Sequence, residues 1–211
     1  MWYAQRGEDK KLHELIGGKT NGFYIDVGAW HHKNDSVTKH FYNKGWRGIN
    51  IEPIHEYYIG LVLHRPRDIN LKIALSDHNG EETFYYFKDT GLSTLDKIVG
   101  DVTSEKRDVE KIIVPTQTLE TICNAHLFDG FSNLQPIDFL KIDVEGHESE
   151  VLRGGDWELF RPHYLCIEAT FPNTETPNWH GWLDFITHTC EYEEIEFDGL
   201  NYFLYDRYQG P

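Results

Sequence analysis

Short apolar runs recur along the chain, and segments with a helical spacing of apolar residues lie between several of them. Runs typical of strands occupy residues 22–27, 47–53, 69–77, 137–146 and 163–170. Helices are expected at 35–46, where Asp35 or Ser36 can cap the first turn, and at 55–63. Strands that alternate with helices predict a parallel sheet with helices on both faces, a three-layer α/β/α sandwich.

The C-terminal part has a different pattern. Two alternating runs flank Asp198-Gly199, a turn signal typical of a β-hairpin. The hairpin would add antiparallel strands at one edge and complete a mostly parallel, seven-stranded sheet. Residues 81–87 and 111–119 also have strand character, with a polar loop between them. No repeat or linker-like stretch interrupts the sequence, so we expect residues 1–211 to form a single domain.

Acidic residues fall at four of the expected strand ends: Asp26, Glu52, Asp143 and Glu168. In a parallel sheet the carboxyl ends of the strands meet at one edge, where ligands bind. A single carboxylate there could simply cap the next helix. Four of them on one edge favour a shared binding cleft.

Composition and charge exclude several functions. The chain has 35 acidic and 20 basic residues and a net charge of -15, which disfavours binding to nucleic acid or to an anionic membrane surface. No apolar run approaches the roughly 20 residues of a membrane span, and the N-terminal residues do not resemble a signal peptide. Three cysteines without a CxxC pair fit reduced thiols. We therefore expect a cytoplasmic protein, alone or as one domain of a longer glycan-synthesis protein.

The first strand end suggests the kind of ligand. Glu52 follows Gly28 by 24 residues, close to the roughly 20-residue spacing at which a carboxylate binds a ribose diol. The turn at Gly28 has no GxGxxG, and a dinucleotide's pyrophosphate needs several glycines. A ribose-bearing ligand without phosphates fits better, and S-adenosylmethionine (SAM) is such a ligand. Gly28 would let the backbone approach its methionine part.

The sequence also resembles a known family. The blocks "FYIDVGAWHHKNDSVTKHFYNKGWRGINIEP", "ALSD", "GLSTL" and "FLKIDVEGHESEVLRGG" are similar to FkbM-type SAM-dependent methyltransferases, and the similarity extends from "QRGED" to the end of the chain. The resemblance implies a Rossmann-like class I methyltransferase fold and methylation of hydroxyl groups, often on sugars or secondary metabolites. The chain departs from the family at Trp30, where a small polar residue, commonly Asn, is usual. His31 matches a histidine of one branch.

Carried over to this chain, the resemblance implies SAM contacts at Asp26, Gly28 and Glu52, and at Ser76 and Asp77 beside the adenine. Gln5 would belong to an N-terminal segment folded over the pocket. The full expected cofactor-binding set is Gln5, Asp26, Gly28, Ala29, Ser36, Glu52, Pro53, Ser76, Asp77 and Asp143.

The reacting end is expected in "KIDVEGHE", which supplies Lys141, Asp143, Glu145, His147 and Glu148. Asp143 should face the methyl group, and His147 or His31 is a reasonable base because the histidine pKa is near 6.5. Either histidine could instead be an ordinary loop residue. Lys141 is better explained by a salt bridge, although a catalytic role stays open.

A divalent metal such as Mg²⁺ is a further possibility, with Asp143 and Glu168 as candidate ligands. The spacing of histidines and cysteines does not resemble a zinc site.

The resulting hypothesis is an O-methyltransferase that acts on a sugar hydroxyl of a glycan or glycoconjugate. Two alternatives remain open. One is a Rossmann-type NAD(P)-dependent oxidoreductase, which the missing glycines disfavour. The other is a non-catalytic glycan-binding module, suggested by the six tryptophans and twelve tyrosines, but such a module does not need four carboxylates at strand ends.

Overall fold

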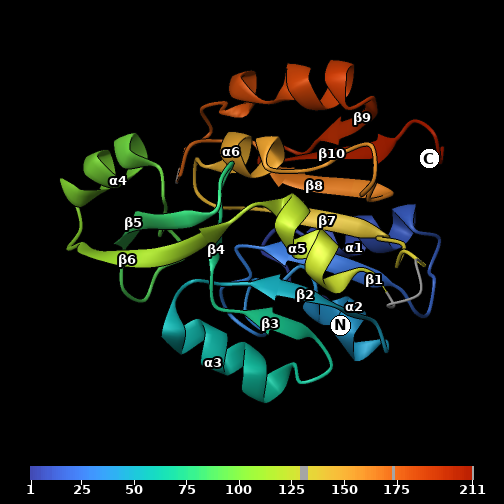
Figure 1. Ribbon diagram of the computed structural model, residues 1–211, viewed down its shortest axis with the longest axis horizontal. Helices are drawn as coiled ribbons and strands as arrows, with labels where there is room; N and C mark the ends of the chain where they lie inside the picture. Colours follow the sequence, from blue (N-terminus) through green and yellow to red (C-terminus); the bar gives the residue numbers. More distant parts are fainter. Residues whose placement is uncertain (129–132, 173, 211) are drawn as a thin grey trace.

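The computed structural model describes residues 1–128, 133–172 and 174–210, and a twisted sheet runs through its centre (Figure 1). Within these residues the main sheet has seven strands in the order β3-β2-β1-β7-β8-β10-β9. They are β1 (Phe23–Val27), β2 (Arg47–Ile51), β3 (Ile69–Leu71), β7 (Phe139–Ile142), β8 (Tyr164–Glu168), β9 (Tyr192–Phe197) and β10 (Asn201–Asp206). The first five are parallel and the last two antiparallel, which confirms the predicted fold class.

Helices cover both faces of this sheet, because successive side chains of each strand point to opposite sides. On one face Tyr24 of β1 packs with Phe41 of α2; on the other, Ile25 packs in one core with Ile122 of α5 and Val151 of α6. The first face carries α1 (Glu8–Leu15) and α2 (Lys39–Asn43), and the second carries α5 (Leu119–His126) and α6 (Glu148–Arg153). A 3₁₀ turn (Trp179–Gly181) and a π-helical turn (Phe185–Thr189) extend the second layer.

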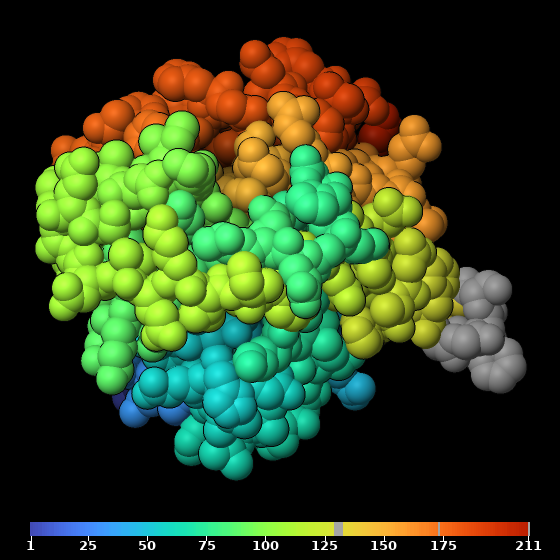
Figure 2. Space-filling model, turned by 60° about the vertical axis from the view of Figure 1, so that its left-hand side comes forward, coloured from blue at the N-terminus to red at the C-terminus, as the bar shows by residue number. Residues whose placement is uncertain are grey.

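A second, smaller sheet stands beside the main one. It has the order β4-β6-β5, formed by β4 (Ala74–Leu75), β5 (Gly80–Tyr86) and β6 (Glu110–Gln117), with α4 (Lys97–Ser104) between β5 and β6. Seen from that side, its green and yellow-green atoms cover the middle of the molecule, between the orange C-terminal segments and the cyan α3 (His55–His64) (Figure 2). Ala74, Leu75 and Phe84 of this sheet line one side of the candidate site described below.

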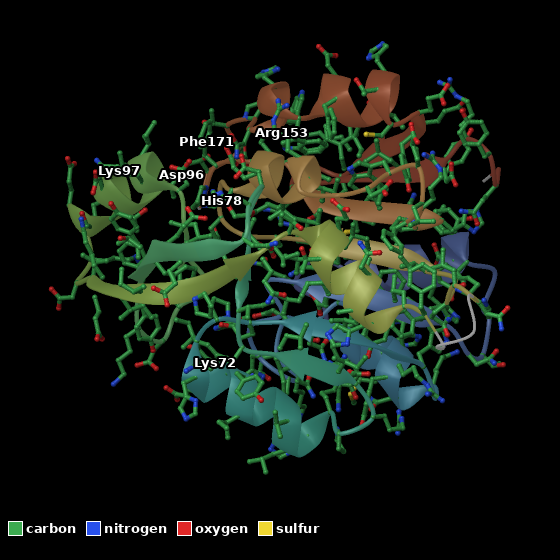
Figure 3. All side chains as sticks on the ribbon, viewed as in Figure 1. Lys72, His78, Asp96, Lys97, Arg153 and Phe171 are labelled. Carbon is green, nitrogen blue, oxygen red and sulfur yellow. The ribbon has the colours of Figure 1, made fainter. Side chains whose placement is uncertain are left out.

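The single strand predicted at residues 69–77 is wrong in one respect. The chain leaves the main sheet after β3, at the exposed Lys72 (Figure 3), and β4 pairs with β6 instead. The apolar pattern continues across the break because both short strands have buried or half-buried side chains. Periodicity alone therefore could not reveal the change of sheet.

The predicted helix at 35–46 is shorter than expected and is not capped by Asp35 or Ser36. Asp35 has a left-handed backbone with φ of 53°, and α2 starts only after Thr38. The Thr38 hydroxyl donates to Asp26 Oδ2 at 2.6 Å, so it does not cap the helix. By contrast, α3 (His55–His64) lies where predicted. In the described parts of the chain, no helix combines the length and apolar character needed to cross a membrane.

The C-terminal hairpin is confirmed. β9 and β10 pair antiparallel, and Gly199 has a φ of 96°, a backbone conformation that glycine adopts without strain. The Asp198 side chain accepts hydrogen bonds from the backbone N–H groups of Leu200 and Asn201, which fixes the turn.

Candidate active site

Strand pairing brings the first two charged residues of the site together. In the parallel register of β1 and β7, Asp26 lies opposite Lys141, on the face of the sheet that carries Tyr24. Asp26, Lys141 and Glu168 occupy alternate positions that would otherwise hold apolar side chains on that face. The sheet thus fixes a row of charges at its carboxyl edge.

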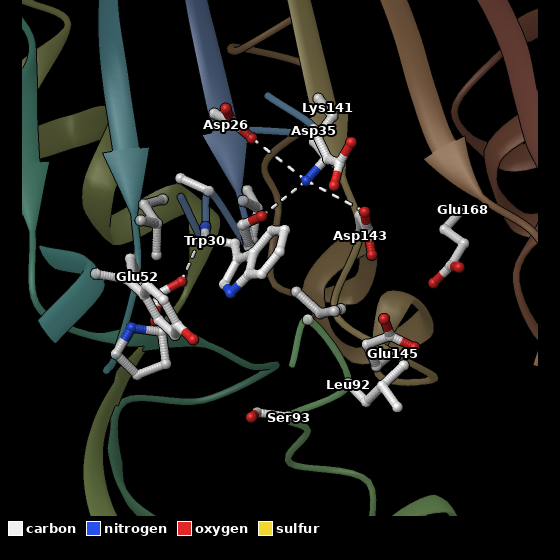
Figure 4. Close-up of a pocket in the computed structure, with 18 of the residues that line it drawn as sticks. Asp26, Trp30, Asp35, Glu52, Leu92, Ser93, Lys141, Asp143, Glu145 and Glu168 are labelled. Carbon is white, nitrogen blue, oxygen red and sulfur yellow. Dashed lines mark hydrogen bonds and ion pairs between the residues drawn. The ribbon is translucent and has the colours of Figure 1, made fainter. Parts of the chain in front are cut away.

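Lys141 is held by three oxygen atoms. Its Nζ donates to the Gly28 carbonyl oxygen at 2.7 Å and lies 3.4 Å from both Asp26 Oδ1 and Asp143 Oδ2 (Figure 4). Burial lowers the pKa of Lys141, but the charges of Asp143 and Asp26 more than compensate and raise it above the ordinary value. The salt bridge expected of Lys141 is present, and an ammonium held in this way is a poor proton acceptor.

The turn after β1 is shaped by close packing. Gly28 has a φ of 74°, and a Cβ at this position would lie 1.8 Å from the Asp143 carbonyl oxygen. Its N–H and that of Ala29 donate to the Ile51 carbonyl oxygen at 3.1 Å each. Residue 28 must therefore be glycine because the backbone of Asp143, at the end of β7, leaves no room for a side chain.

Glu52 lies directly after β2, and its carboxylate closes this turn. Oε2 accepts from the Trp30 N–H at 3.0 Å and Oε1 from the Ile54 N–H at 2.7 Å. Burial raises the pKa of Glu52 to about 7, against the opposing effect of these two N–H groups. A carboxylate has about four acceptor positions, so two remain for a ligand hydroxyl pair.

A group of three carboxylates forms the other end of the site. Asp143, Glu145 and Glu168, here called the carboxylate cluster, each offer an oxygen within 4.8 Å of the others. Burial raises the pKa of Glu145 well above its ordinary value, and the charges of Asp143 and Glu148 raise it further. The pKa of Glu168 is raised in the same way, by burial and then by Asp143 and Glu145.

A cavity of about 360 Å³ connects Glu52 with the carboxylate cluster, a size within the range of small-molecule sites. Trp30 lines it between the two ends, and Leu92 lies beside Glu145 at the cluster end (Figure 4). The predicted site residues that line it are Gln5, Asp26, Gly28, Ala29, Ser36, Glu52, Pro53, Lys141, Asp143, Glu145, His147 and Glu168.

Backbone strain gathers around this cavity. Trp30, Asp35 and Glu145 have φ values of 44°, 53° and 57°, in the left-handed region that only glycine and a few polar residues adopt readily. All three line the cavity. Strained residues are typical of functional sites, where the surrounding structure holds them in place.

Three predicted site residues do not line the cavity. His31 Nδ1 accepts from the N–H groups of Lys33 and Asn34, so it stabilises a turn. Asp77 is exposed, and its Oδ1 lies 2.7 Å from Nδ1 of His78, which is labelled in Figure 3. Ser76 directly follows β4 of the second sheet and is buried, and its Oγ lies 3.2 Å from His147 Nε2.

Sequence reasoning missed several residues of the cavity. Glu8 is buried there, accepts from Asn201 Nδ2 at 3.1 Å, and joins α1 to β10. Tyr57 and Leu92 line it from α3 and from the loop after β5. Glu8 stands in "QRGED", the block that carried the N-terminal resemblance, whereas Asn201 meets it only through the tertiary fold.

Comparison with known proteins agrees with this geometry. No curated protein matches the chain. A family model described as the methyltransferase FkbM domain matches residues 26–194, from the β1 carboxylate into β9. The match covers most of the chain and includes Glu52 and the whole carboxylate cluster. The chain therefore belongs to the FkbM methyltransferase family.

Proposed function

We propose that the protein transfers the methyl group of SAM to a hydroxyl group, most suitably on a sugar of a glycan or glycoconjugate. The observation that carries this proposal is the continuous cavity from Glu52 to the carboxylate cluster. One end offers a carboxylate for a ribose diol, and the other offers acidic groups for a hydroxyl acceptor. The acidic lining also suits the positive sulfonium and ammonium groups of SAM.

The cofactor would lie along the carboxyl ends of β1, β2 and β7. Glu52 would accept hydrogen bonds from the ribose hydroxyls while it keeps its bonds to Trp30 and Ile54. The apolar side chains of Ile54, Ala74 and Leu75 line the same cavity and offer a surface for the adenine. We therefore propose these three side chains as the adenine contacts, in place of Ser76 and Asp77, which the resemblance implied.

The acceptor would approach from the carboxylate cluster. Methyl transfer from a sulfonium needs the acceptor oxygen in line with the methyl group, and a group that removes the hydroxyl proton. We assign the alignment to Asp143 and the proton removal to His147, since His147 is the one of the two predicted histidines that lines the cavity. Its contact with Ser76 Oγ would fix the orientation of the ring.

Variants of these two residues test the assignment. Asp143→Asn preserves shape, so it should bind SAM within a few-fold of the wild type yet lose most turnover. His147→Ala should lose about 10²–10⁴-fold in rate, the usual contribution of a general base. His31→Ala is the matched control, because His31 lies outside the cavity lining, and it should keep its activity. Full activity of His147→Ala would mean that a group other than His147 removes the hydroxyl proton.

We propose that residues 1–211 work as one methyltransferase domain, because cavity residues come from Gln5 near the N-terminus to Asn201 in β10. A cytosolic location is proposed with it. Cys123, Cys166 and Cys190 are all buried as free thiols, which suits a reducing compartment.

Incubation of the protein with methyl-labelled SAM and a panel of saccharides tests the function directly. Labelled saccharide in the wild type, but not in Asp143→Asn, is the expected result. Label confined to protein or nucleic acid would overturn the sugar assignment. Saccharide binding without any methyl transfer would favour a glycan-binding module.

A further inference from the structure

Within the described residues, two buried carboxylate oxygens of the cavity have neither a hydrogen bond nor an ion pair. Glu145 and Glu168 are only 9% and 8% exposed, and Oε2 of each makes no hydrogen bond within the described residues. A buried polar atom without a partner is costly, and a buried charge is more so. Such groups call for a ligand that supplies positive charge.

Neighbouring cations do not meet this need. Lys141 is shared between Asp26, Asp143 and the Gly28 carbonyl, and neither Glu145 nor Glu168 forms an ion pair with a described residue. The nearby Glu148 adds a further acidic group instead. Its two oxygens are already bonded to the N–H groups of Val144 and Gly146 and to Asn178 Nδ2.

The turn that carries Glu145 holds its side chain inward. Glu148 Oε1 accepts from the Val144 and Gly146 N–H groups at 3.1 Å each, and Glu145 between them has a φ of 57°. Figure 4 shows the carboxylates of Asp143, Glu145 and Glu168 grouped on one side of the cavity, away from Glu52. Their oxygens lie within 4.8 Å of one another, close enough to share one ion.

We propose that the carboxylate cluster binds one divalent, oxygen-preferring cation of the Mg²⁺, Mn²⁺ or Ca²⁺ class, with Asp143, Glu145 and Glu168 as protein ligands. Carboxylates are the ligands these ions prefer, and thiolates or imidazoles are not needed. Three protein ligands leave positions of a six-coordinate ion open toward the cavity, for water and for acceptor oxygens. Adjacent hydroxyls, as in a sugar diol, are acceptors that could fill two of them. This last point rests on the proposed function; ion binding itself does not.

The test is a titration of Mn²⁺ into metal-free protein without SAM or acceptor, with the loss of the free-ion electron paramagnetic resonance signal as readout. We expect one Mn²⁺ per chain, displaced by Mg²⁺ or Ca²⁺ and not by Na⁺. Glu145→Gln and Glu168→Gln should each weaken Mn²⁺ binding at least tenfold. Glu8→Gln is the matched control. It removes the same charge from the same cavity, but both Glu8 oxygens have partners, so the change should be less than threefold.

A thermal melt in EDTA shows whether the variants fold. Glu168→Gln should melt at or above the wild-type temperature, because it removes repulsion between like charges, and Mn²⁺ should stabilise the wild type only. No Mn²⁺ uptake by the wild type at millimolar concentration would overturn the inference. An equal loss of Mn²⁺ affinity in Glu8→Gln would also overturn it, because the ion would then be attracted by the overall negative charge of the cavity and not bound by the carboxylate cluster. Methyl transfer that persists in EDTA would then leave the proposed function intact.

Discussion

Gly28 shows at residue scale how the strand ends fit together. Its φ of 74° is unfavourable for other residues, and a Cβ would meet the Asp143 carbonyl oxygen at 1.8 Å. Gly17 shares the first property, with a φ of 68°, but a Cβ there would meet nothing within 4 Å. The two glycines therefore separate the backbone effect from the packing effect.

Gly28→Ala should lower the free energy of unfolding by about 3 kcal/mol or more, because the β7 end must move as well as the turn. Gly17→Ala should cost about 1 kcal/mol, the penalty for a left-handed alanine. Urea unfolding followed by circular dichroism measures both. Equal losses would mean that the Asp143 backbone does not constrain the turn.

Glu52 links the site to pH. Burial raises its pKa to about 7 in the folded protein, whereas an unfolded Glu titrates near 4.5. The folded state therefore holds this proton more tightly than the unfolded state. The contribution of Glu52 to the free energy of unfolding is therefore fully present below about pH 4.5, and it is lost as the pH rises through about 7. Ribose hydroxyls that donate to Glu52 would favour the ionised form.

SAM affinity should consequently rise between pH 6 and pH 8. With a pKa of about 7, the ionised fraction of Glu52 grows from roughly 0.1 to roughly 0.9, up to about a tenfold gain. Lys141 and Asp26 are the charged groups that act on Glu52, and both are retained in Glu52→Gln. Calorimetry should show a flatter profile for this variant. Identical profiles would exclude Glu52 as the titrating group.

At the scale of elements, Arg65 directly follows α3 and connects this helix with β1 and with the start of α2. It is fully buried, with Nε 2.9 Å from Asp68 Oδ2 and an Nη donating to the Tyr24 hydroxyl of β1 at 2.6 Å. The same guanidinium donates to Thr38 Oγ1 before α2. This explains why Thr38 does not cap its helix, and it fixes α2 and α3 against β1.

Arg65→Met should destabilise the fold by about 3–5 kcal/mol, because Asp68 would become a buried charge without its cation. The loss should be smaller in an Asp68→Asn background, where that charge is already absent. A double-mutant cycle of chemical unfolding measures the difference. An equal cost of Arg65→Met in both backgrounds would refute a coupling of the two side chains.

The strands of the main sheet and the final hairpin could be predicted because their apolar runs and the Asp198-Gly199 turn are local signals. The helices α1, α4, α5 and α6, each of eight residues or fewer, were not predicted. Two of them had usable signals. The Asp96 side chain accepts from Val99 N, and that of Thr118 from Thr121 N, as N-caps do.

The candidate site was predictable where it depends on strand ends. Asp26, Glu52, Asp143 and Glu168 line one cavity because parallel strands end at one edge. His31, Ser76 and Asp77 lie next to such ends in sequence, but loop conformation turns their side chains elsewhere. The contact of Glu8 with Asn201 joins two ends of the chain and has no local signal.

For the whole molecule, the second sheet completes the site. Phe84 of β5, and Thr90 to Ser93 and Leu95 from the segment after β5, line the same cavity as Asp26 in β1 and Glu52 directly after β2. The family match, residues 26–194, covers the whole second sheet and all of the main sheet except the start of β1, the end of β9 and β10. The cavity is therefore a joint product of the two sheets, and a ligand that fills it should stabilise them together.

The central claim is that SAM lies across the strand ends with its ribose on Glu52. Calorimetric titration of SAM and NAD⁺ into the wild type, Glu52→Ala and the exposed control Glu56→Ala tests it most directly. We predict one SAM per chain, no NAD⁺ binding, and unchanged affinity in Glu56→Ala. Loss of two charge-assisted hydrogen bonds, each worth roughly 1.5–3 kcal/mol, should weaken SAM binding to Glu52→Ala at least tenfold. Equal SAM affinity in Glu52→Ala and the wild type, or NAD⁺ binding in place of SAM, would contradict the account.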